Sequence, residues 1–269
     1  MPADVAADVI ANTPLSSDYN VLALAAPAIA ASATPGQFVM VKAAAGHDPL
    51  LRRPFSVFEI LRDRDGGPTG ITLLNKRVGA STRLLYTARP GDRVACLGPL
   101  GRPWEPPSHG SAAFMVAGGV GLAAFATLAE SLAVARVQQV LFYGARTGAE
   151  LFYLDFFRAL GVELVLTTED GSVGERGRIT APLERRLTSP ADRTPVVYAC
   201  GPEAMMAATS SVARRHRAPC FVSLERVMGC GLGGCYSCVV PVRSEDGHVH
   251  HVRSCLAGPV MAAEQIVWD

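Results

Sequence analysis

The chain has 269 residues, of which 49% are hydrophobic and 18% are charged, and its formal net charge is +1. This composition excludes a disordered chain and allows two small globular domains with an appendage. The small net charge gives no reason to expect a nucleic acid or an anionic membrane as a partner.

Residues 1–107 contain short hydrophobic runs separated by turn residues such as Pro35-Gly36 and Pro90-Gly91. Short strands at this spacing predict a small antiparallel barrel. The expected strands are Tyr19–Ala25, Gln37–Ala43, Phe55–Leu61, Ile71–Arg77 and Arg93–Leu97.

The third expected strand begins at the run Arg52-Arg53-Pro54-Phe55-Ser56. An arginine can pair with a phosphate, an aromatic ring can lie against a flavin, and a hydroxyl can hydrogen-bond a flavin nitrogen. Further on, Val78-Gly79-Ala80-Ser81-Thr82 precedes an amphipathic turn, where free amides at a helix start favour a pyrophosphate. Taken alone, each run also fits an ordinary strand start or a plain helix cap.

In this order and spacing, the two runs resemble the FAD-binding barrel of the ferredoxin–NADP reductase superfamily. The resemblance implies that Arg53 contacts the FAD phosphates, that Phe55 stacks on the flavin and that Ser56 lies near its reactive nitrogen. Phe55 replaces the tyrosine that is common in the superfamily, so any phenol hydrogen bond is lost. The other FAD contacts implied by the resemblance are Pro54, Leu74, Asn75, Lys76, Gly79, Ser81 and Thr82.

From residue 108 the pattern changes to strands that alternate with helices, which predicts a parallel sheet covered by helices over 108–218. The expected elements are strands Phe114–Ala117, Gln139–Tyr143, Glu163–Thr167 and Val196–Ala199, and helices Ala123–Arg136 and Phe152–Leu160. The uncharged stretch Gly110–Ala129 is long enough to span a bilayer. Glycines interrupt its middle, so we expect a strand and a helix there, and no membrane span.

The loop between the first of these strands and its helix fits G-x-G-x-x-A at Gly119, Gly121 and Ala124, where a backbone approaches a pyrophosphate closely. The acidic ribose ligand of that fingerprint is missing, and Arg146 stands near its expected position. The loop resembles the G-G-x-G loop of the reductase superfamily, with Ala124 where proline is common. The resemblance implies that NAD is bound by Gly118, Gly119 and Gly121, while the choice between NAD and NADP stays open.

The last strand of this region is followed by Cys200-Gly201-Pro202-Glu203-Ala204-Met205-Met206. This run resembles the superfamily's segment beside the nicotinamide. The resemblance implies further NAD contacts from Cys200, Gly201 and Pro202, and it makes Cys200 the candidate catalytic residue. A small buried core residue is the alternative role for Cys200, and it is the expected role of Cys96 and Cys220.

The chain contains seven cysteines, and four of them follow the C-x4-C-x2-C…C spacing of plant-type [2Fe–2S] ligands. These four are Cys230, Cys235, Cys238 and Cys255. Glycines inside the loop supply left-handed backbone angles and amides that are free to point at the sulfurs. Such a loop predicts one-electron transfer. The start of the chain carries Asp4 where a signal peptide would be basic, so we expect reduced thiols in the cytoplasm.

The expected fold class is a multidomain β and α/β protein. It has an N-terminal antiparallel FAD-binding barrel over 1–107 and a central parallel α/β nucleotide-binding domain over 108–218. A C-terminal [2Fe–2S] cluster segment follows over 219–269. Ser223-Leu224-Glu225-Arg226 leads into the cysteine loop, and Gly258-Pro259-Val260 follows its last ligand.

Over the whole chain this set resembles the electron-transfer subunits of NAD-dependent, two-subunit bacterial dihydroorotate dehydrogenases. The resemblance implies FAD, a [2Fe–2S] cluster and NAD as cofactors. It also implies an FMN-containing catalytic subunit as partner, in a heterotetramer of two copies of each chain. Electrons from dihydroorotate would pass through the cluster and FAD to NAD+ in pyrimidine biosynthesis. Nothing in this chain looks like a base for dihydroorotate, so the chain alone should not oxidise it.

Alternatives remain open at this point. The flavin and iron–sulfur subunit of a sulfhydrogenase or of a ferredoxin:NAD(P) oxidoreductase shares the cysteine spacing, although Gly234 and Tyr236 beside the second cysteine favour the orotate system. A non-redox zinc module also takes four thiolates, but zinc sites usually contain C-x2-C twice. A Rieske site would need two histidines in place of cysteines, so we expect the nearby histidines on a solvated hairpin around Asp246-Gly247. These histidines are His248, His250 and His251.

Overall fold

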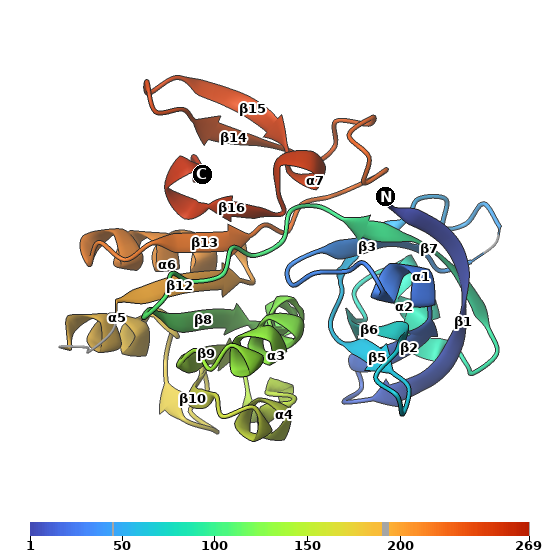
Figure 1. Ribbon diagram of the computed structural model, residues 1–269, viewed down its shortest axis with the longest axis horizontal. Coiled ribbons are helices and arrows are strands. Elements are labelled where there is room, and N and C mark those ends of the chain that lie inside the picture. The colour runs from blue at the N-terminus through green and yellow to red at the C-terminus, as the bar shows by residue number, and fades with distance from the viewer. Residues whose placement is uncertain (45, 190–193, 269) are drawn as a thin grey trace.

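Two seven-stranded sheets stand side by side in the computed structural model, which describes residues 1–44, 46–189 and 194–268 (Figure 1). The first sheet is antiparallel and N-terminal, and the second is mainly parallel. Residues 190–193 of the predicted second domain and Asp269 of the predicted third lie outside the described part. The arrangement confirms the expected fold class.

The N-terminal sheet has the strand order β4-β3-β7-β1-β2-β6-β5. Its strands are β1 (Ala3–Pro14), β2 (Tyr19–Ala25), β3 (Phe38–Lys42), β4 (Arg53–Ser56), β5 (Ile60–Arg62), β6 (Pro68–Lys76) and β7 (Arg93–Leu100). Helices α1 (Pro27–Ala30) and α2 (Ala80–Thr87) pack beside β6. Ala7, Leu22 and Val39 are fully buried in the core that the curled sheet encloses.

The predicted strand Phe55–Leu61 is in fact the adjoining parts of two strands, β4 and β5, which form the two edges of this sheet. Between them the amide of Val57 donates to the carbonyl of Gln37 at 3.0 Å, and the amide of Phe58 donates to the carbonyl of Thr72 at 3.0 Å. The chain therefore crosses from the β3 side to the β6 side within two residues. This crossing brings the edges together, as closing a sheet into a barrel requires.

Strand β1 was not expected, because Ala, Asp and Asn are poor strand formers. It nevertheless pairs antiparallel with both β2 and β7. Ala7 and Val9 are buried, while the residues on either side of them face outward or are less buried. Strand β1 therefore forms because it pairs on both sides and buries every second side chain, and not because its residues favour a strand.

The central sheet has the order β11-β10-β9-β8-β12-β13-β16, in which only the edge pair β13 and β16 is antiparallel among the described strands. Its strands are β8 (Ala112–Gly118), β9 (Gln139–Ala145), β10 (Glu163–Thr168), β11 (Glu175–Arg176), β12 (Pro195–Cys200), β13 (Cys220–Ser223) and β16 (Val260–Ala262). The predicted boundary at residue 219 therefore falls between two neighbouring strands of one sheet. The cysteine loop is an insertion between β13 and β16.

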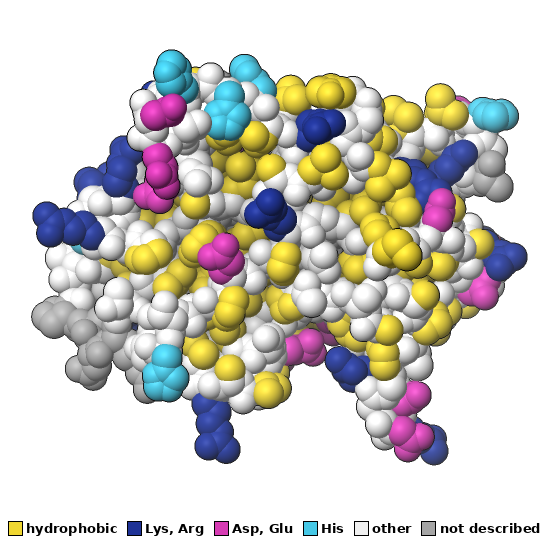
Figure 2. Space-filling view, turned by 45° about the horizontal axis from the view of Figure 1, so that its top comes forward, with side chains coloured by type: hydrophobic (Ala, Val, Ile, Leu, Met, Phe, Trp, Pro, Cys, Tyr) yellow, Lys and Arg dark blue, Asp and Glu magenta, His cyan; other side chains and the backbone are white. Residues whose placement is uncertain are grey.

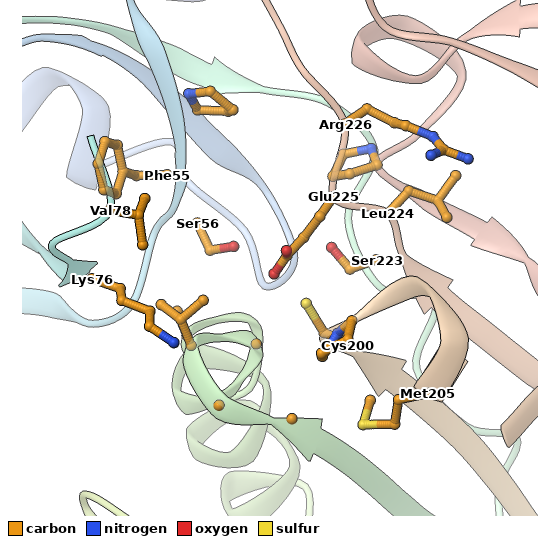
Figure 3. Close-up of a pocket in the computed structure, with 18 of the residues that line it drawn as sticks. Phe55, Ser56, Lys76, Val78, Cys200, Met205, Ser223, Leu224, Glu225 and Arg226 are labelled. Carbon is orange, nitrogen blue, oxygen red and sulfur yellow. The ribbon is translucent and has the colours of Figure 1, made fainter. Parts of the chain in front are cut away.

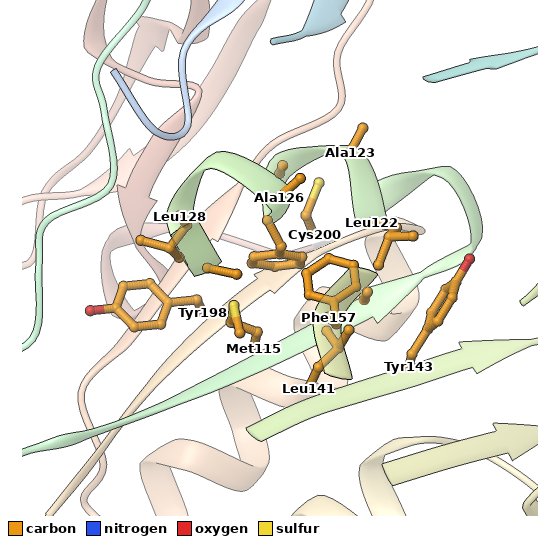
Figure 4. Close-up of a cluster of buried hydrophobic side chains, with 14 of the residues drawn as sticks. Met115, Leu122, Ala123, Ala126, Leu128, Leu141, Tyr143, Phe157, Tyr198 and Cys200 are labelled. Carbon is orange, nitrogen blue, oxygen red and sulfur yellow. The ribbon is translucent and has the colours of Figure 1, made fainter. Parts of the chain in front are cut away.

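Helices cover both faces of the central sheet. They are α3 (Ala126–Val134), α4 (Leu154–Ala159), α5 (Thr180–Thr188) and α6 (Glu203–Arg215), with 3-10 turns η1 (Gly119–Ala124) and η2 (Gly148–Glu150). Met115 of β8 packs with α3 and α4 in one hydrophobic cluster, and its neighbour Phe114 packs with α5 and α6 in another. In the first cluster Leu128, Phe157 and Cys200 lie close together (Figure 4).

Two of these helices correspond to the expected ones, and two were not expected. The expected helix Ala123–Arg136 is α3, shortened because its first turn is the 3-10 turn η1, and Phe152–Leu160 contains α4. Helices α5 and α6 had no counterpart in the sequence analysis. Within the described residues, no helix is both long enough and apolar enough to cross a membrane.

The C-terminal part adds the hairpin β14 (Val239–Arg243) and β15 (Val249–Arg253), the short helix α7 (Ser254–Ala257) and the turn η3 (Ala263–Gln265). The expected hairpin around Asp246-Gly247 is confirmed, and the three histidines on it are exposed. Met228, Cys238 and Cys255 are buried against Met40 of the barrel. The cysteine loop is therefore held by apolar contact with the barrel as well as by the central sheet.

Candidate functional site

A cavity of about 1800 Å³ lies where the barrel, the central sheet and the cysteine loop meet (Figure 3). A single ligand typically occupies a pocket of about 300–1000 Å³, so this cavity has room for more than one cofactor. Strands β8, β9, β10 and β12 are parallel, and their carboxyl ends open on the cavity. That edge is where α/β sheets bind nucleotides.

The barrel side of the cavity carries most of the residues expected to bind FAD. Arg53, not Arg52, faces the cavity, because the Arg52 guanidinium donates to the carboxylate of Asp4 at 2.9 Å. Phe55 and Ser56 follow it along β4 and point toward the cavity (Figure 3). The expected FAD residues that line the cavity are Arg53, Pro54, Phe55, Ser56, Leu74, Lys76, Gly79, Ser81 and Thr82.

Asn75 is the expected FAD residue that does not line the cavity. Side chains alternate along a strand, so Leu74 and Lys76 face the cavity while Asn75 points to the other side of β6. Its amide nitrogen donates to the side chain of Asn20 at 2.7 Å and to the carbonyl of Thr82 at 3.0 Å. Asn75 therefore ties β6 to β2 and α2 through its amide nitrogen, and its contact with FAD stays a prediction.

The start of α2 is shaped by a hydrogen-bonded cap. The Thr82 hydroxyl accepts from the amides of Val78 and Gly79 at 2.9 and 2.8 Å. Gly79 has no heavy atom within 4 Å of where a Cβ would stand, so its backbone is open to the cavity. The amides of the first helical turn, which have no partner in the helix itself, suit a phosphate group at this place.

The cavity wall also contains a buried polar atom without a partner. The Tyr19 hydroxyl makes no hydrogen bond with any described residue, and it lies 3.8 Å from where a Cβ on Gly119 would stand. Tyr19 lines the cavity, and the Lys76 ammonium lies 5.1 Å from the centre of its ring. Buried polar atoms are normally satisfied, so a bound group with polar atoms fits this wall.

The glycines expected to bind NAD lie where two loops pack backbone against backbone. A Cβ on Gly118 would come 2.7 Å from Met205 Sδ, and one on Gly121 would overlap the carbonyl oxygen of Cys200. A Cβ on Gly201 would come 3.0 Å from the Gly118 Cα, and Gly201 itself does not line the cavity. Gly119 has φ +53° and faces the cavity. Gly118 and Gly121 thus allow close packing, and Gly119 leaves a bare backbone for a ligand.

The far end of the cavity is charged. Arg146 lines this end and pairs with Glu150 at 2.8 Å. In a Rossmann fingerprint, the carboxylate that binds the ribose is expected near this position. Glu169, directly after β10, lines the same end. A carboxylate near the expected place therefore comes from the next strand along the sheet, a position that the linear fingerprint does not indicate.

Three residues of β12, β13 and the segment after β13 meet at the centre of the cavity. Cys200 and Ser223 lie beside each other, and Glu225 points between them and Ser56 (Figure 3). Burial raises the pKa of the Cys200 thiol, and the nearby Glu225 carboxylate raises it further, so the thiol is neutral at pH 7. Glu225 was not among the expected site residues. Its place just after a strand of the sheet and before the cysteine loop was the available indication.

The Glu225 carboxyl is open to the cavity but enclosed by its walls. This burial raises its pKa above 4.5, against a smaller lowering by Lys76. Between the pKa of Glu225 in the unfolded chain and its raised pKa in the folded protein, the folded protein keeps a proton that the unfolded chain has lost. The stability that this proton confers is therefore present at low pH and is lost as pH rises through the raised pKa. Glu225→Gln should remove that loss. The thermal unfolding midpoint of the variant, relative to that of the wild type, should therefore increase from pH 5 to pH 8. Glu245→Gln, on an exposed turn, is the control, and an equal pH dependence in all three proteins would contradict the prediction.

The four loop cysteines approach one another in two pairs. The thiol of Cys235 interacts with that of Cys230, and the thiol of Cys255 interacts mainly with that of Cys238 and less with that of Cys230. In residues 1–44, 46–189 and 194–268, no three His, Cys, Asp or Glu side chains gather as closely as a single metal ion requires. Two thiolates for each of two irons is the ligand set of a [2Fe–2S] cluster, so the paired arrangement fits that group.

Backbone amides and left-handed glycines surround these sulfurs. The amide of Leu232 donates to Cys230 Sγ at 3.3 Å, and the Ser237 hydroxyl lies 3.1 Å from Cys235 Sγ. Hydrogen bonds from Ser237 lower the pKa of Cys235 to about 6, which favours the thiolate that binds iron. Gly231 and Gly233 have φ of +74° and +80°, and a Cβ on Gly231 would come 2.5 Å from Met40 Cγ. The loop therefore needs glycine at both positions.

Comparison with family models and curated proteins agrees with this site. Residues 225–267 match the model of the iron–sulfur cluster binding domain of dihydroorotate dehydrogenase B, and residues 115–211 match an oxidoreductase NAD-binding domain. A dihydroorotate dehydrogenase B (NAD(+)) electron transfer subunit of Desulforamulus reducens is 39% identical over 91% of this chain and 90% of its own length. That of Bacillus caldolyticus is 40% identical over 87% of this chain and 86% of its own.

Solved structures share the fold. An NADH-dependent reduced ferredoxin–NADP oxidoreductase has a TM-score of 0.84 and 28% identity, and the match covers 100% of this chain and 92% of that one. A ferredoxin NADP+ reductase from Neisseria gonorrhoeae with bound FAD and NADP has a TM-score of 0.67 at 17% identity, covering 79% of this chain and 91% of that one. The second likeness shows the fold alone.

Proposed function

The chain belongs to the family of electron transfer subunits of dihydroorotate dehydrogenase B, and from this premise we propose that it carries electrons from a dihydroorotate-oxidising catalytic subunit to NAD+. Its cofactors are FAD, a [2Fe–2S] cluster and NAD. The observation that carries the proposal is that all three parts of the chain line the same cavity. Its lining includes Ser56 of the barrel, Gly119 and Cys200 of the central sheet, and Cys230 and Cys235 of the cluster loop.

Each cofactor supplies a different electron chemistry when bound: an iron–sulfur cluster exchanges single electrons, a nicotinamide exchanges a hydride, and a flavin can do both. The residues of this chain bind and orient these groups. Arg53 and the amides at the start of α2 supply positive charge and donors for the FAD phosphates. Phe55 offers an aromatic face to the flavin, and Ser56 offers a hydroxyl beside it.

On the nicotinamide side, the bare backbone at Gly119 accepts the pyrophosphate of NAD, and Cys200 with Pro202 borders the nicotinamide. The Cys200 thiol stays neutral, because burial raises its pKa. The Cys200 side chain therefore places no negative charge beside the site of hydride transfer. Glu225, whose carboxyl also has a raised pKa, can hold a proton beside the flavin or hydrogen-bond a cofactor there.

At the third wall, Cys230, Cys235, Cys238 and Cys255 would hold the two irons of the cluster. Cys230 and Cys235 line the cavity, whereas Cys238 and Cys255 are buried against the barrel. The cluster is therefore held at the edge of the flavin cavity by this chain alone. No docking of a second domain is needed to bring the two together.

Exposed apolar side chains surround the cluster loop and mark the surface where the catalytic subunit would dock. They are Val227, Leu232, Tyr236, Val239 and Leu256. Figure 2 turns this end of the molecule toward the reader and shows apolar side chains gathered between scattered charges. We assign this surface to an FMN-containing catalytic subunit, in a heterotetramer of two copies of each chain, because apolar patches of this kind mark protein interfaces. Seven free cysteines support a reducing, cytoplasmic location.

A spectroscopic experiment tests the relay. Anaerobically purified chain should show a flavin spectrum, a rhombic EPR signal after reduction by dithionite, and about two irons per chain. Mixed with its catalytic subunit, it should reduce NAD+ at the expense of dihydroorotate, and it should not do so alone. Zinc in place of iron, or the absence of bound flavin, would overturn the proposal.

A second candidate function is supported by one observation. The structure with a TM-score of 0.84 belongs to an NADH-dependent reduced ferredoxin–NADP oxidoreductase, so a ferredoxin could be the electron donor in place of the dihydroorotate-oxidising subunit. The same purified chain decides between them. Reduction of NAD+ or NADP+ by reduced ferredoxin, together with inactivity toward dihydroorotate and the catalytic subunit, would favour the second function.

A further inference from the structure

The segment that joins the central sheet to the cluster loop is held by few backbone hydrogen bonds. Residues 224–229 lie in no helix or strand. Within the described part of the chain, the amide of Leu224 donates to the carbonyl of Pro259 at 2.9 Å, and the amide of Gly229 donates to the Ser237 hydroxyl at 3.0 Å. The four residues between them make no backbone hydrogen bond to any described residue. Their course depends on side chains.

One side chain of this segment forms a two-point ion pair. Arg226 Nη1 donates to Glu203 Oε2 at 2.7 Å, and Arg226 Nη2 donates to Glu203 Oε1 at 2.7 Å. The two side chains are 22% and 38% exposed, so the pair is partly shielded from water. A bidentate pair fixes both distance and orientation, unlike an ordinary surface ion pair. Figure 3 shows the Arg226 side chain directed away from that of Glu225, and both residues line the cavity.

Glu203 is a firm anchor for this pair. It is the first residue of α6 and directly follows Cys200-Gly201-Pro202, whose backbone is interlocked with Gly118 and Gly121. The positive end of the helix dipole at that position favours its carboxylate. The loop that borders the nicotinamide therefore continues directly into the residue that binds Arg226.

The other end of the segment leads to the cluster. Met228 is buried with Cys238 and Cys255 against the barrel, and Cys230 follows two residues later. The ion pair stands between this apolar contact and strand β13. It is thus the polar tie between the loop that ligates iron and the loop that borders the nicotinamide.

We propose that the Arg226–Glu203 pair positions the cluster loop against the flavin and nicotinamide site, and so sets the rate of electron transfer between cluster and flavin. This inference rests on the proposed function. Arg226 and Glu203 are positioning residues, since they act through the pair that they form with each other: Arg226 lines the cavity, whereas Glu203 does not. An unanchored segment lets Cys230 and Cys235 shift relative to the flavin. Electron transfer between two cofactors slows as the distance between them grows, so a shift of this loop lowers the rate.

The test separates the two electron transfers in time. Holoprotein is mixed with NADH, flavin reduction is followed by absorbance, and cluster reduction is followed by freeze-quench EPR. In Arg226→Lys and Glu203→Gln, flavin reduction should keep its rate, and cluster reduction should slow severalfold. Lysine keeps the positive charge but cannot form the two-point hydrogen bond of the guanidinium, and glutamine keeps the shape of glutamate but not its charge. The exchanged variant, Glu203→Arg with Arg226→Glu, should recover part of the lost rate.

A second readout does not depend on a loaded protein. In cluster-free protein, amide hydrogen exchange over 224–238 should be faster in both single variants than in the wild type, because local opening is easier. Arg215→Gln is the matched control, since Arg215 also pairs from α6, with Glu184 of α5, away from the cluster loop. It should change neither readout.

Each outcome decides the inference. Unchanged cluster reduction in both single variants would overturn it, and so would equal slowing of flavin and cluster reduction, which would place the effect at the nicotinamide site. Unchanged hydrogen exchange over 224–238 would overturn the anchoring role. If one variant loses a cofactor, the other carries the test. Failure of the proposed function is a separate result, because it would show in the wild type itself, either as the lack of a reducible cluster or as no reduction of NAD+ by dihydroorotate with the catalytic subunit.

Discussion

Replacement of Cys238 by serine should remove the [2Fe–2S] cluster and leave the flavin reaction with NADH intact. Cys238 is 1% exposed, and its thiol interacts with that of Cys255. In the serine variant, therefore, neither water nor another thiol can take the place of the lost cysteine ligand unless the loop opens. A hydroxyl is a far poorer ligand for iron than a thiolate. Iron should fall from about two per chain to near zero, and the EPR signal of the reduced protein should disappear.

Activity should divide along the same line. NADH should still reduce the flavin, because Cys238 does not line the cavity. Reduction of NAD+ by dihydroorotate in the presence of the catalytic subunit should fall to background, since the cluster is the link between the two chains. Cys220→Ser is the matched control, because Cys220 is a half-buried cysteine in β13 outside the loop. An undiminished EPR signal in Cys238→Ser would show that this cysteine is not a ligand.

The cluster loop illustrates what a sequence can predict well. Three of its four cysteines lie within nine residues, so their spacing alone restricts how the backbone can wrap a cluster. Gly231 and Gly233 adopt the left-handed angles that were expected for such a loop. The pairing of Cys238 with Cys255, in contrast, depends on the hairpin β14–β15, which returns the chain to the loop.

Residues whose role depends on distant neighbours could not be predicted. Strand β1 exists because β2 and β7 pair with it, and its Ala- and Asp-rich sequence gives no local indication. Glu225 enters the cavity because β13 lies parallel to β12 and ends beside Cys200. Asn75 is among the expected FAD residues because Leu74-Asn75-Lys76 resembles a segment that contacts FAD in the reductase superfamily. The alternation of the strand turns it away.

The domain division shows the same limit at a larger scale. The predicted change from barrel to alternating strands and helices, at residue 108, falls in the linker between β7 and β8. The boundary at residue 219 was drawn where helical periodicity stops. Yet β13 and β16 both belong to the central sheet, so the cluster segment and the nicotinamide domain share strands. Sheet pairing between distant segments leaves no mark in local sequence, and it is what brings the cluster to the cavity.

Gly121→Ala should disrupt nicotinamide binding and destabilise the protein. The added Cβ would overlap the carbonyl oxygen of Cys200, and that carbonyl belongs to a loop locked against Gly118. Neither backbone can yield without separating η1 from β12. Overpacking of this kind costs about 1–3 kcal/mol of unfolding free energy. Displacement of the two loops should also raise the Kd for NADH by about tenfold, which corresponds to about 1.4 kcal/mol of lost binding.

Urea unfolding and NADH titration of the flavin-loaded protein measure the two effects of Gly121→Ala. Gly234→Ala is the control: nothing lies within 4 Å of its Cβ position, so neither stability nor NADH binding should change. The FAD content and the EPR signal of Gly121→Ala should stay normal, because Gly121 contacts neither β4 nor the cysteine loop. Wild-type affinity for NADH in a destabilised Gly121→Ala would mean that the glycine serves packing alone. The bare backbone at Gly119 would then bind the pyrophosphate without depending on how η1 packs against β12.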